Sequence, residues 1–274
     1  MEMKTKTVCI YHADCLDGFA SAYIVHSVMP EAEFVPGVYG NDPPDVAGAL
    51  VYIVDFSYPR DVLLRMAERA SRIVILDHHK TAKINLVNLP DNVEVVFDMN
   101  KSGARLTWEY FLPNNLVPKW VYQVEDRDLW RFALPGTREV TAALFSYPYD
   151  FDVWAEVTRQ PYYLLAEAGE HLLRDHDQEV KKLLTHARFM RIGGIEVPVV
   201  NTIKKYASDV GSLLSIDKPF AATYFDTGNI REFSLRSSPD GVDVSLVAEM
   251  YGGGGHKHAS GFRISIAEAQ KLEL

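Results

Sequence analysis

The sequence is poor in cysteine, in net positive charge and in long apolar runs. Only two cysteines, Cys9 and Cys15, occur in its 274 residues, and no second pair is present to complete a zinc site. The 37 acidic residues exceed the 28 basic ones, and the formal net charge of -9 argues against a protein that coats duplex DNA. No run of about 18 apolar residues occurs, so no membrane span is expected. We therefore expect a reduced, cytoplasmic protein.

The composition is that of an ordinary globular protein, with 47% hydrophobic and 24% charged residues. The N-terminal segment Met1–Thr7 carries lysines but is followed by only a short apolar run, which soon meets His12, Asp14 and Asp17. This segment does not have the pattern of a signal peptide. The length predicts two domains.

Short apolar runs alternate with helical patterns in the first part of the chain. Strands are predicted at residues 7–11, 50–54, 73–76 and 93–97, with helices at 18–28 and 59–70. Buried-type strands separated by helices favour an α/β fold, a parallel sheet with helices on both faces. In such sheets, ligands bind at the carboxyl ends of the strands.

A long charged helix is predicted over residues 166–190, after a mostly helical stretch with turns at four prolines. The predicted division is a first domain at 1–160, a connecting helix at 161–190 and a smaller α/β domain at 191–274. In this second domain, strands are predicted at 195–200, 220–225 and 230–236, and helices at 206–214 and 244–251.

Aspartate and histidine side chains gather where the predicted strands and helices end. The segments are His12 to Asp17, Asp55, Asp77-His78-His79 and Asp126-Arg127-Asp128. Any one aspartate after a strand is commonly a helix cap, but several carboxylates at one edge of a sheet cannot all stay ionised without a cation. Mixed Asp and His ligands suit manganese, iron, cobalt or zinc better than calcium, and metal pairs about 3.5–4 Å apart serve phosphoester hydrolysis. The combination predicts a divalent metal site.

A glycine-rich segment near the C-terminus is the other concentrated signal. Gly252–Gly255 is followed by His256, and backbone N–H groups in glycine-rich turns that open a helix can bind an anion. Arg236-Ser237 ends the preceding predicted strand, where the guanidinium can bind the same anion. Two alternatives stay open, since glycine runs also form turns and hinges, and Arg236 alone suits a surface ion pair equally well.

These motifs together resemble the DHH phosphoesterase superfamily, a DHH domain followed by a DHH-associated domain, over nearly the whole chain. The matching segments are His12 to Gly18, Asp55, Asp77-His78-His79, Ser102-Gly103-Ala104, Asp126 and Gly252 to Gly261. One departure concerns the first motif, in which the family commonly has two aspartates separated by one residue. Here Asp14 and Asp17 are separated by two, so Asp14 is either a metal ligand or an acceptor for His12.

The resemblance implies two divalent metal ions, most often Mn²⁺, that hydrolyse phosphoester or phosphoanhydride bonds in a cleft between the two domains. Asp55 is the expected bridging ligand, His79 is expected to face the substrate phosphate, and Asp128 is an alternative to Asp126. The implied metal ligands are His12, Asp14, Asp17, Asp55, His78 and Asp126. The implied substrate-binding residues are Arg236, Ser237, Gly253, Gly254, Gly255 and His256.

The acidic balance and the length favour a short nucleotide over a long polyanion as substrate. Among the family's activities, we therefore expect a nanoRNase-like phosphodiesterase that converts short oligonucleotides or dinucleotides to 5'-mononucleotides. Linear pGpG is the expected example, and cyclic dinucleotides are further candidate substrates. The alternatives are a phosphatase for 3',5'-bisphosphate nucleotides (pAp), an exopolyphosphatase, and a sensor that binds a nucleotide without cleaving it. No long duplex and no membrane is expected as a partner, and a homodimer is expected by analogy alone.

Overall fold

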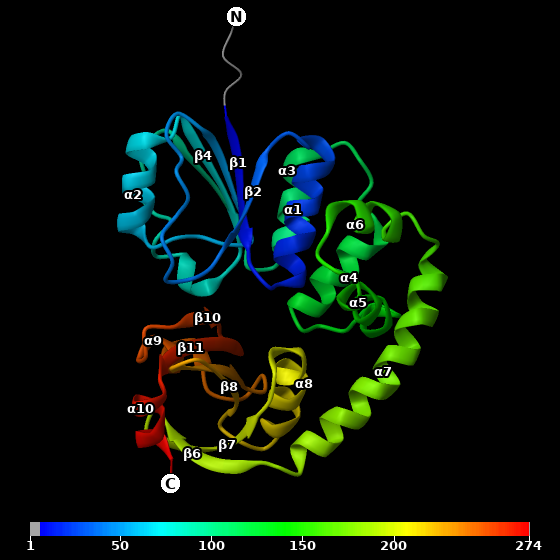
Figure 1. The fold of residues 1–274 in the computed structure, drawn as a ribbon, viewed down its shortest axis with the longest axis vertical. Coiled ribbons are helices and arrows are strands. Elements are labelled where there is room, and N and C mark those ends of the chain that lie inside the picture. The colour runs from blue at the N-terminus through cyan, green and yellow to red at the C-terminus, as the bar shows by residue number, and fades with distance from the viewer. Residues whose placement is uncertain (1–5, 274) are drawn as a thin grey trace, which may run out of the picture. The chain divides into compact units, whose positions relative to one another are not determined.

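The structure, a computed structural model, describes residues 6–273 (Figure 1). Residues 1–5, most of the segment compared above with a signal peptide, and residue 274 lie outside the described residues. The chain divides into two compact units, Met1–Leu173 and Arg174–Leu274, each with its own sheet. The predicted α/β class, with a parallel sheet in the first unit, is confirmed.

The first unit is built on a five-stranded parallel sheet in the order β2-β1-β3-β4-β5. Its strands are β1 (Thr7–His12), β2 (Glu33–Gly37), β3 (Leu50–Val54), β4 (Arg72–Asp77) and β5 (Val93–Phe97). The central strands were predicted because they are continuous apolar runs, as expected where both faces of a sheet are covered. The sequence analysis missed β2, an edge strand that contains Pro36 and is only partly buried.

Helices cover both faces of this sheet. Leu63 and Met66 of α2 (Arg60–Arg69) pack on Ile10, Ile53 and neighbouring side chains of one face. The alternate strand residues Cys9 and Val54 pack on the other face, together with side chains of α1 (Leu16–Val28) and α3 (Gly103–Phe111). Figure 1 shows α2 on one side of the sheet and α1 and α3 on the other.

The rest of the first unit is helical, with turns at the prolines that the sequence indicated. Helices α4 (Lys119–Asp128), α5 (Thr137–Ser146) and α6 (Phe151–Val157) pack around the fully buried Trp154. The long helix α7 (Tyr162–Leu184) begins and ends earlier than the predicted 166–190. It cannot extend to residue 190 because residues 188–192 form strand β6. Among residues 6–273, no helix combines the length and the apolar character needed to cross a membrane.

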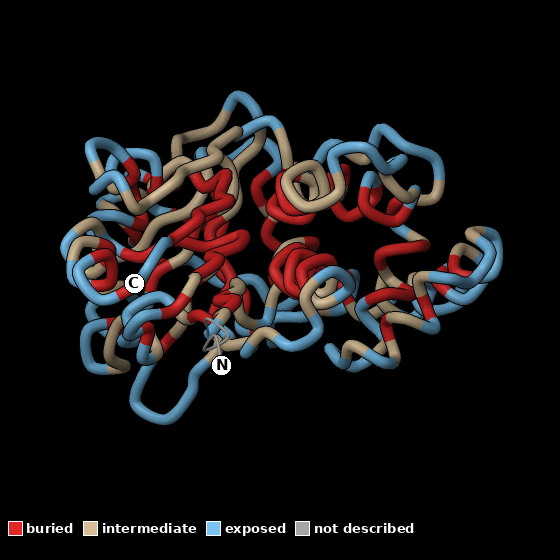
Figure 2. Tube along the Cα trace, turned by 90° about the horizontal axis from the view of Figure 1, so that it is seen from above, coloured by how far each residue is buried: buried red, intermediate tan, exposed pale blue. Residues whose placement is uncertain are grey.

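The second unit contains a six-stranded mixed sheet in the order β10-β11-β9-β8-β7-β6, in which β7 and β8 are parallel. Its strands are β6 (Arg188–Ile192), β7 (Ile195–Asn201), β8 (Ala221–Thr227), β9 (Ile230–Arg236), β10 (Gly254–His256) and β11 (Ala259–Ser265). The helices are α8 (Lys204–Leu214), α9 (Val244–Glu249) and α10 (Ile266–Ala269). Two short 3₁₀ turns, η1 (Lys80–Ala82) and η2 (Gln270–Leu272), complete the elements of both units. Figure 2 shows that buried residues concentrate inside the units and exposed ones in the connections.

The glycine-rich segment is not a turn that opens a helix, which corrects the prediction made for it. Gly254–His256 forms the edge strand β10, antiparallel to β11. A Cβ on Gly253 would lie 2.1 Å from the carbonyl oxygen of Gly261, and Gly255 has a φ of +136°. Close strand packing and backbone conformation therefore require glycine at both positions.

Candidate metal centre

The parallel register of the sheet brings the predicted ligands His12, Asp55 and His78 to one edge. Tyr11 pairs with Val54, and Val54 with Leu76, so the residues that follow each strand lie side by side. Two groups of side chains each place one potential ligand atom per residue within 4.8 Å of one another: Asp17, Asp55 and His78, and His12, Asp55 and His79. Asp55 belongs to both groups, and its role as a bridging ligand stays a prediction.

Asp55 has an unusual backbone conformation and is packed closely against the start of α3. Asp55 has a φ of +53°, which is uncommon for a residue with a side chain. Gly103 at the start of α3 packs against it so closely that a Cβ there would lie 2.4 Å from the Asp55 Cβ. Gly18 similarly packs against His12, where a Cβ would lie 2.7 Å from the His12 Cβ. Both glycines are therefore needed for the starts of α1 and α3 to approach the carboxyl edge of the sheet.

Asp17 is oriented by the N-terminus of α3. Its carboxylate accepts hydrogen bonds from the backbone N–H of Gly103 at 2.5 Å and of Ala104 at 3.0 Å. These donors fix the side chain in place, and the helix N-terminus favours its negative charge. Within the segment Ser102-Gly103-Ala104, the absence of a side chain at Gly103 permits the close approach of α3.

His78 lies among three carboxylates. Its Nε2 is 2.9 Å from Asp55 Oδ1, 3.6 Å from Asp128 Oδ2 and 3.7 Å from Asp17 Oδ2. Burial by itself would lower the pKa of His78, but the three carboxylates raise it to about 10. The imidazolium supplies positive charge at a point where so many buried carboxylates require a cation.

Burial raises the pKa of every acid of this cluster, but the charged neighbours decide the direction of the net shift. Burial and the neighbouring carboxylates raise the pKa of Asp17 well above its ordinary value, and burial also raises the pKa of Asp128. Burial opposes ionisation of Asp55 too, but His12 and His78 hold its pKa well below its ordinary value. Asp55 therefore stays ionised at the centre of the cluster.

Three buried ligand atoms of the cluster have no hydrogen-bond partner among the described residues: Asp55 Oδ2, Asp128 Oδ2 and His12 Nδ1. His12 Nδ1 lies 3.4 Å from Asp55 Oδ2. Buried polar atoms are normally paired, so unpaired oxygen and nitrogen atoms at one point indicate a missing positively charged partner. Oxygen and imidazole nitrogen donors are those of first-row divalent metals, and the residues present therefore fit the implied cofactor.

Asp77 is not part of either group but positions His79. Its Oδ1 accepts hydrogen bonds from the backbone N–H of His78 at 2.7 Å and of His79 at 3.1 Å, and it lies 2.7 Å from His79 Nδ1. Burial by itself would lower the pKa of His79, but Asp77 raises it. The contact fixes the orientation of the His79 ring, as carboxylates do for histidines at metal sites.

The structure places Asp128, rather than Asp126, beside His78. Both oxygens of Asp126 face the loop that follows α4, where they accept hydrogen bonds from the N–H of Ala133 and Leu134 and from the Thr137 hydroxyl, at 2.5–3.0 Å. Asp128 lies at the cluster instead. Asp126 therefore lies apart from the two groups, and its role as a metal ligand stays a prediction, with Asp128 as the alternative that lies beside His78. The Asp-Arg-Asp spacing did signal the alternative.

Asp14 also lies apart from the two groups. It is exposed, with a φ of +49°, in the turn between β1 and α1. Cys15, which the sequence analysis named only in excluding a zinc site, is half-buried and occupies the N-cap position of α1 without a side-chain capping hydrogen bond.

The predicted substrate-binding residues lie in the second unit. The Arg236 guanidinium donates to the Ser208 hydroxyl at 2.7 Å and to the Leu235 carbonyl at 2.8 Å. The Ser237 hydroxyl lies 2.9 Å from His258 Nδ1. Gly254, Gly255 and His256 belong to β10, beside β11. Arg236 and Ser237 thus have contacts within their own unit, and their contact with a substrate stays a prediction.

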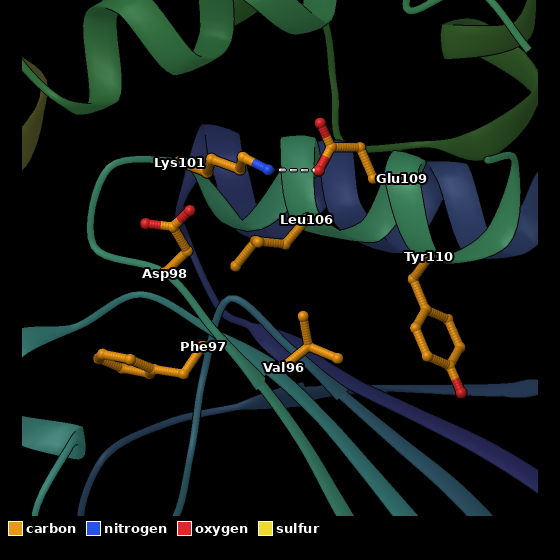
Figure 3. A pocket seen from close by; sticks show the side chains of 7 residues that line it. All are labelled: Val96, Phe97, Asp98, Lys101, Leu106, Glu109 and Tyr110. Carbon is orange, nitrogen blue, oxygen red and sulfur yellow. Dashed lines mark hydrogen bonds and ion pairs between the residues drawn. The ribbon is translucent and has the colours of Figure 1, made fainter.

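A hollow of about 400 Å³ between β5 and α3 offers a contrast to the metal centre (Figure 3). Lys101 at this hollow donates to Glu109 at 2.7 Å, and Arg105 of α3 donates to the same carboxylate at 2.8 Å. We therefore assign no chemistry to it, since the unsatisfied buried ligand atoms lie at the edge formed by β1, β3 and β4.

Two curated proteins are similar to the chain in sequence. "Uncharacterized protein R106" of Acanthamoeba polyphaga mimivirus is 29% identical over 289 residues, which cover 94% of this chain and 67% of the relative. Oligoribonuclease NrnB of Bacillus subtilis is 24% identical over 74% of this chain and 57% of its own length. The chain therefore spans little more than half of NrnB. A scan against models of protein families finds no match.

Solved structures show the same fold at low sequence identity. The pGpG-specific phosphodiesterase PggH of Vibrio cholerae aligns with 98% of this chain and 96% of its own, at 14% identity and a TM-score of 0.52. RecJ of Thermus thermophilus, crystallised with Mn²⁺, aligns with 97% of this chain and 51% of its own, at 15% identity and a TM-score of 0.51. These likenesses show that the chain shares its fold with PggH and RecJ, and the motifs quoted in the sequence analysis resemble those of the DHH superfamily.

Proposed function

We propose that the chain is a metal-dependent phosphodiesterase that hydrolyses very short oligonucleotides and dinucleotides, such as linear pGpG, to 5'-mononucleotides. The observation that carries the proposal is the buried cluster of Asp17, Asp55, His78 and Asp128, whose Asp55 and Asp128 each present an oxygen without a hydrogen-bond partner in the described chain. The names of NrnB, an oligoribonuclease, and PggH, a pGpG-specific phosphodiesterase, support the substrate class.

Two divalent ions, Mn²⁺ first among them, are the cofactor that we propose. Asp17, His78 and Asp128 would hold one ion and His12 the other, with Asp55 between them. When bound, such ions activate water and neutralise charge that develops on a phosphate. RecJ, a structural neighbour, was crystallised with Mn²⁺, which supports this choice.

The chain's own residues would orient the substrate. Asp77 holds Nδ1 of His79, so that the ring can present Nε2 to a phosphate oxygen. Backbone donors of α3 hold the Asp17 carboxylate against rotation. Such preorganised groups lower the barrier because they need no rearrangement when charge develops.

Product analysis tests the proposal. The full chain is freed of metal, supplied with Mn²⁺ and incubated with pGpG, pApA, cyclic di-GMP, cyclic GMP-AMP, pAp, longer RNA, polyphosphate or pyrophosphate, beside a chelated control. We expect metal-dependent mononucleotide from the linear dinucleotides and slow cleavage of longer chains. Phosphate release from pAp or polyphosphate alone would instead indicate a phosphatase. Tight metal and nucleotide binding without turnover would indicate a sensor.

Variants separate the metal centre from surface effects. Asp55→Asn should lower kcat/KM at least about 100-fold, since even outer partners of metal ligands change activity 10- to 100-fold. The control is Asp61→Asn on α2. This variant also removes one carboxylate charge, but Asp61 is exposed and forms its ion pair with Arg65, away from the cluster. Full manganese-dependent turnover by Asp55→Asn would show that the metal assignment is wrong.

A further inference from the structure

Tyr39 lies in the turn that follows the edge strand β2. Gly37, the last residue of β2, pairs with His12 at the end of β1. A backbone hydrogen bond at 3.1 Å then closes the turn at residues 38–41, in which Gly40 has a φ of +88°. Glycine is the usual residue where a turn requires a positive φ. This backbone holds Tyr39 beside the carboxyl end of β1, at the edge of the sheet where the metal centre lies.

The Tyr39 ring packs against three other rings at this edge. Its centroid lies 4.6 Å from that of Phe56, 5.5 Å from that of His12 and 6.3 Å from that of His79. Its plane is nearly perpendicular to both histidine rings, at 73° and 77°, an arrangement that aromatic pairs prefer. Tyr39 therefore contacts an expected metal ligand and the residue that is expected to face the substrate phosphate.

Exposure distinguishes Tyr39 from the rings around it. Phe56 is fully buried and His79 is 9% exposed, whereas Tyr39 is 47% exposed. Tyr58, which packs on Phe56 at a centroid distance of 4.9 Å, is buried and belongs to the apolar core. Tyr39 is thus the ring at which this aromatic group meets solvent, and its exposed part is available to a ligand.

The charge of the loop indicates which part of a nucleotide it can accept. Residues 38–45 include Asp42 and Asp45 but no lysine, arginine or histidine. The negative charges disfavour a phosphate at this loop. A nucleobase is uncharged, and every base has a π face that can stack on an aromatic side chain. The Tyr39 ring therefore suits the base of a nucleotide and not its phosphate.

The unsatisfied ligand atoms of the metal centre place the phosphate nearby. Asp55 Oδ2 and His12 Nδ1 lie 3.4 Å apart, and neither has a hydrogen-bond partner among residues 6–273. Both residues belong to the potential metal group that also contains His79. A phosphate bound through a metal at this group would lie within one nucleotide of the Tyr39 ring, because that ring packs on His12 and His79.

We propose that Tyr39 binds the nucleobase next to the cleaved phosphate by stacking on it. This inference rests on the proposed function, since it takes the metal centre as the site of the phosphate. Stacking does not read the hydrogen-bonding groups of a base, so Tyr39 accepts any base and favours those that stack most strongly. A substrate without a base, such as polyphosphate, gains nothing from this contact.

Fluorescence of a base analogue tests the stacking without turnover. The full chain is mixed with Mg²⁺ and a dinucleotide that carries 2-aminopurine at one position or the other. A methylene phosphonate replaces the ester to be cleaved, so the probe is not hydrolysed. Stacking on an aromatic ring quenches 2-aminopurine. At one of the two positions, we expect quenching by the parent chain and by Tyr39→Phe. Tyr39→Leu should lose it and should bind the probe roughly 10-fold more weakly in equilibrium dialysis.

Two controls separate stacking from packing. Leucine keeps an apolar side chain over Phe56, so the metal content and melting temperature of Tyr39→Leu should equal those of the parent. Tyr163→Leu on α7 replaces a tyrosine that is 65% exposed, and it should quench and bind the probe as the parent does.

Photochemical labelling of the unmodified chain covers the case in which Tyr39→Leu does not fold. An 8-azidopurine version of the same probe, irradiated in the complex, should label the turn at residues 38–41, as located by peptide mass analysis. Labelling confined to other segments would overturn the inference, as would undiminished quenching by folded Tyr39→Leu. A chain that binds neither probe would overturn it together with the nucleotide substrate of the proposed function.

The outcomes distinguish this inference from the proposed function. Quenching that depends on Tyr39, in a chain that cleaves none of the nucleotides, would support the inference and contradict the phosphodiesterase proposal. Metal-dependent cleavage of pGpG with the same KM in the parent and in Tyr39→Leu would support the phosphodiesterase and remove Tyr39 from the substrate site. If both proposals hold, Tyr39→Leu should raise the KM for pGpG roughly 10-fold and change kcat little.

Discussion

Two aspartates of helix α4, separated by one residue, have different partners. Asp126 accepts three hydrogen bonds from the loop after the helix, and Asp128 faces His78. A carboxylate satisfied by the backbone stabilises the fold, whereas one with an unsatisfied oxygen in a cluster of acids is available to a metal. The side chain's surroundings, rather than its type, decide its role.

Replacement of each aspartate should therefore change a different property. Asp126→Ala leaves two backbone N–H groups and the Thr137 hydroxyl without their acceptor and should lower the free energy of unfolding by roughly 3 kcal/mol. Asp128→Asn should have little effect on stability in chelator but should reduce the bound metal. Urea unfolding and metal content measure the two effects. Normal stability of Asp126→Ala, combined with loss of metal, would restore Asp126 as the ligand.

Gly103 offers a test of the close approach to Asp55. A methyl group at position 103 would lie 2.4 Å from the Asp55 Cβ, so Gly103→Ala must displace Asp55 or the start of α3. We expect loss of metal binding in calorimetry, together with lower stability. The control is Gly48→Ala, where φ is +66° and no atom lies within 4 Å of the added Cβ. It should cost only the backbone strain, about 1 kcal/mol, and retain metal binding.

At the scale of elements, one arginine of β9 links the two strands of the β8–β9 hairpin through hydrogen bonds to an aspartate of β8. Arg231 donates to Asp226 through Nε at 2.7 Å and Nη2 at 2.9 Å, and its guanidinium lies 4.0 Å from the centre of the Tyr224 ring. It also donates to Glu273 near the chain end at 3.2 Å. A planar guanidinium can make these contacts at the same time, whereas an ammonium group cannot.

This ion pair predicts a pH dependence of stability. The Arg231 guanidinium holds the pKa of Asp226 below its ordinary value. The stabilisation is therefore present above the ordinary aspartate pKa, near 3.9, and is lost as the pH falls through the lower pKa of the folded state. Asp226→Asn should lower the free energy of unfolding by about 1 kcal/mol at neutral pH, since the pair is partly exposed.

The measurement is urea unfolding of the parent and of Asp226→Asn from neutral pH down to the acid limit of the folded protein. The difference between the two chains should shrink as the pH falls below about 4. A difference that is constant with pH would show that the charge of Asp226 contributes nothing.

At the scale of the whole molecule, metal binding should be coupled to stability and to protons. Without metal, the pKa of His78 is about 10, because neighbouring carboxylates favour its charged form. Burial raises the pKa of Asp17 and of Asp128. Divalent ions bind the deprotonated groups, so binding should release protons and should strengthen as the pH rises towards 10. Ligands that bind only the folded state also stabilise it.

Calorimetric titration with Mn²⁺ in two buffers of different ionisation enthalpy measures this proton release, and thermal unfolding with and without chelator measures the stabilisation. We expect proton release and a higher melting temperature with metal. His78→Gln should reduce both. Binding with no proton release, at any pH between 6 and 9, would contradict the arrangement of acids around His78.

The sequence alone determined the features that depend on short-range pattern. Strand β3 (Leu50–Val54) was predicted to the residue because a strand covered on both faces is a continuous apolar run. The same pattern placed Asp55 and His78 at strand ends, and parallel strands bring their carboxyl ends to one edge. The general location of the metal centre follows from these two facts.

Only the tertiary structure decided which neighbouring side chain faces the metal centre. Asp126 and Asp128 lie on one helix, but the loop before α5 faces the first and His78 the second. In the first motif, Asp14 has a positive φ and is exposed, whereas Asp17 is buried against the start of α3. Such choices depend on contacts between residues far apart in sequence, and no local pattern of apolar and polar residues contains them.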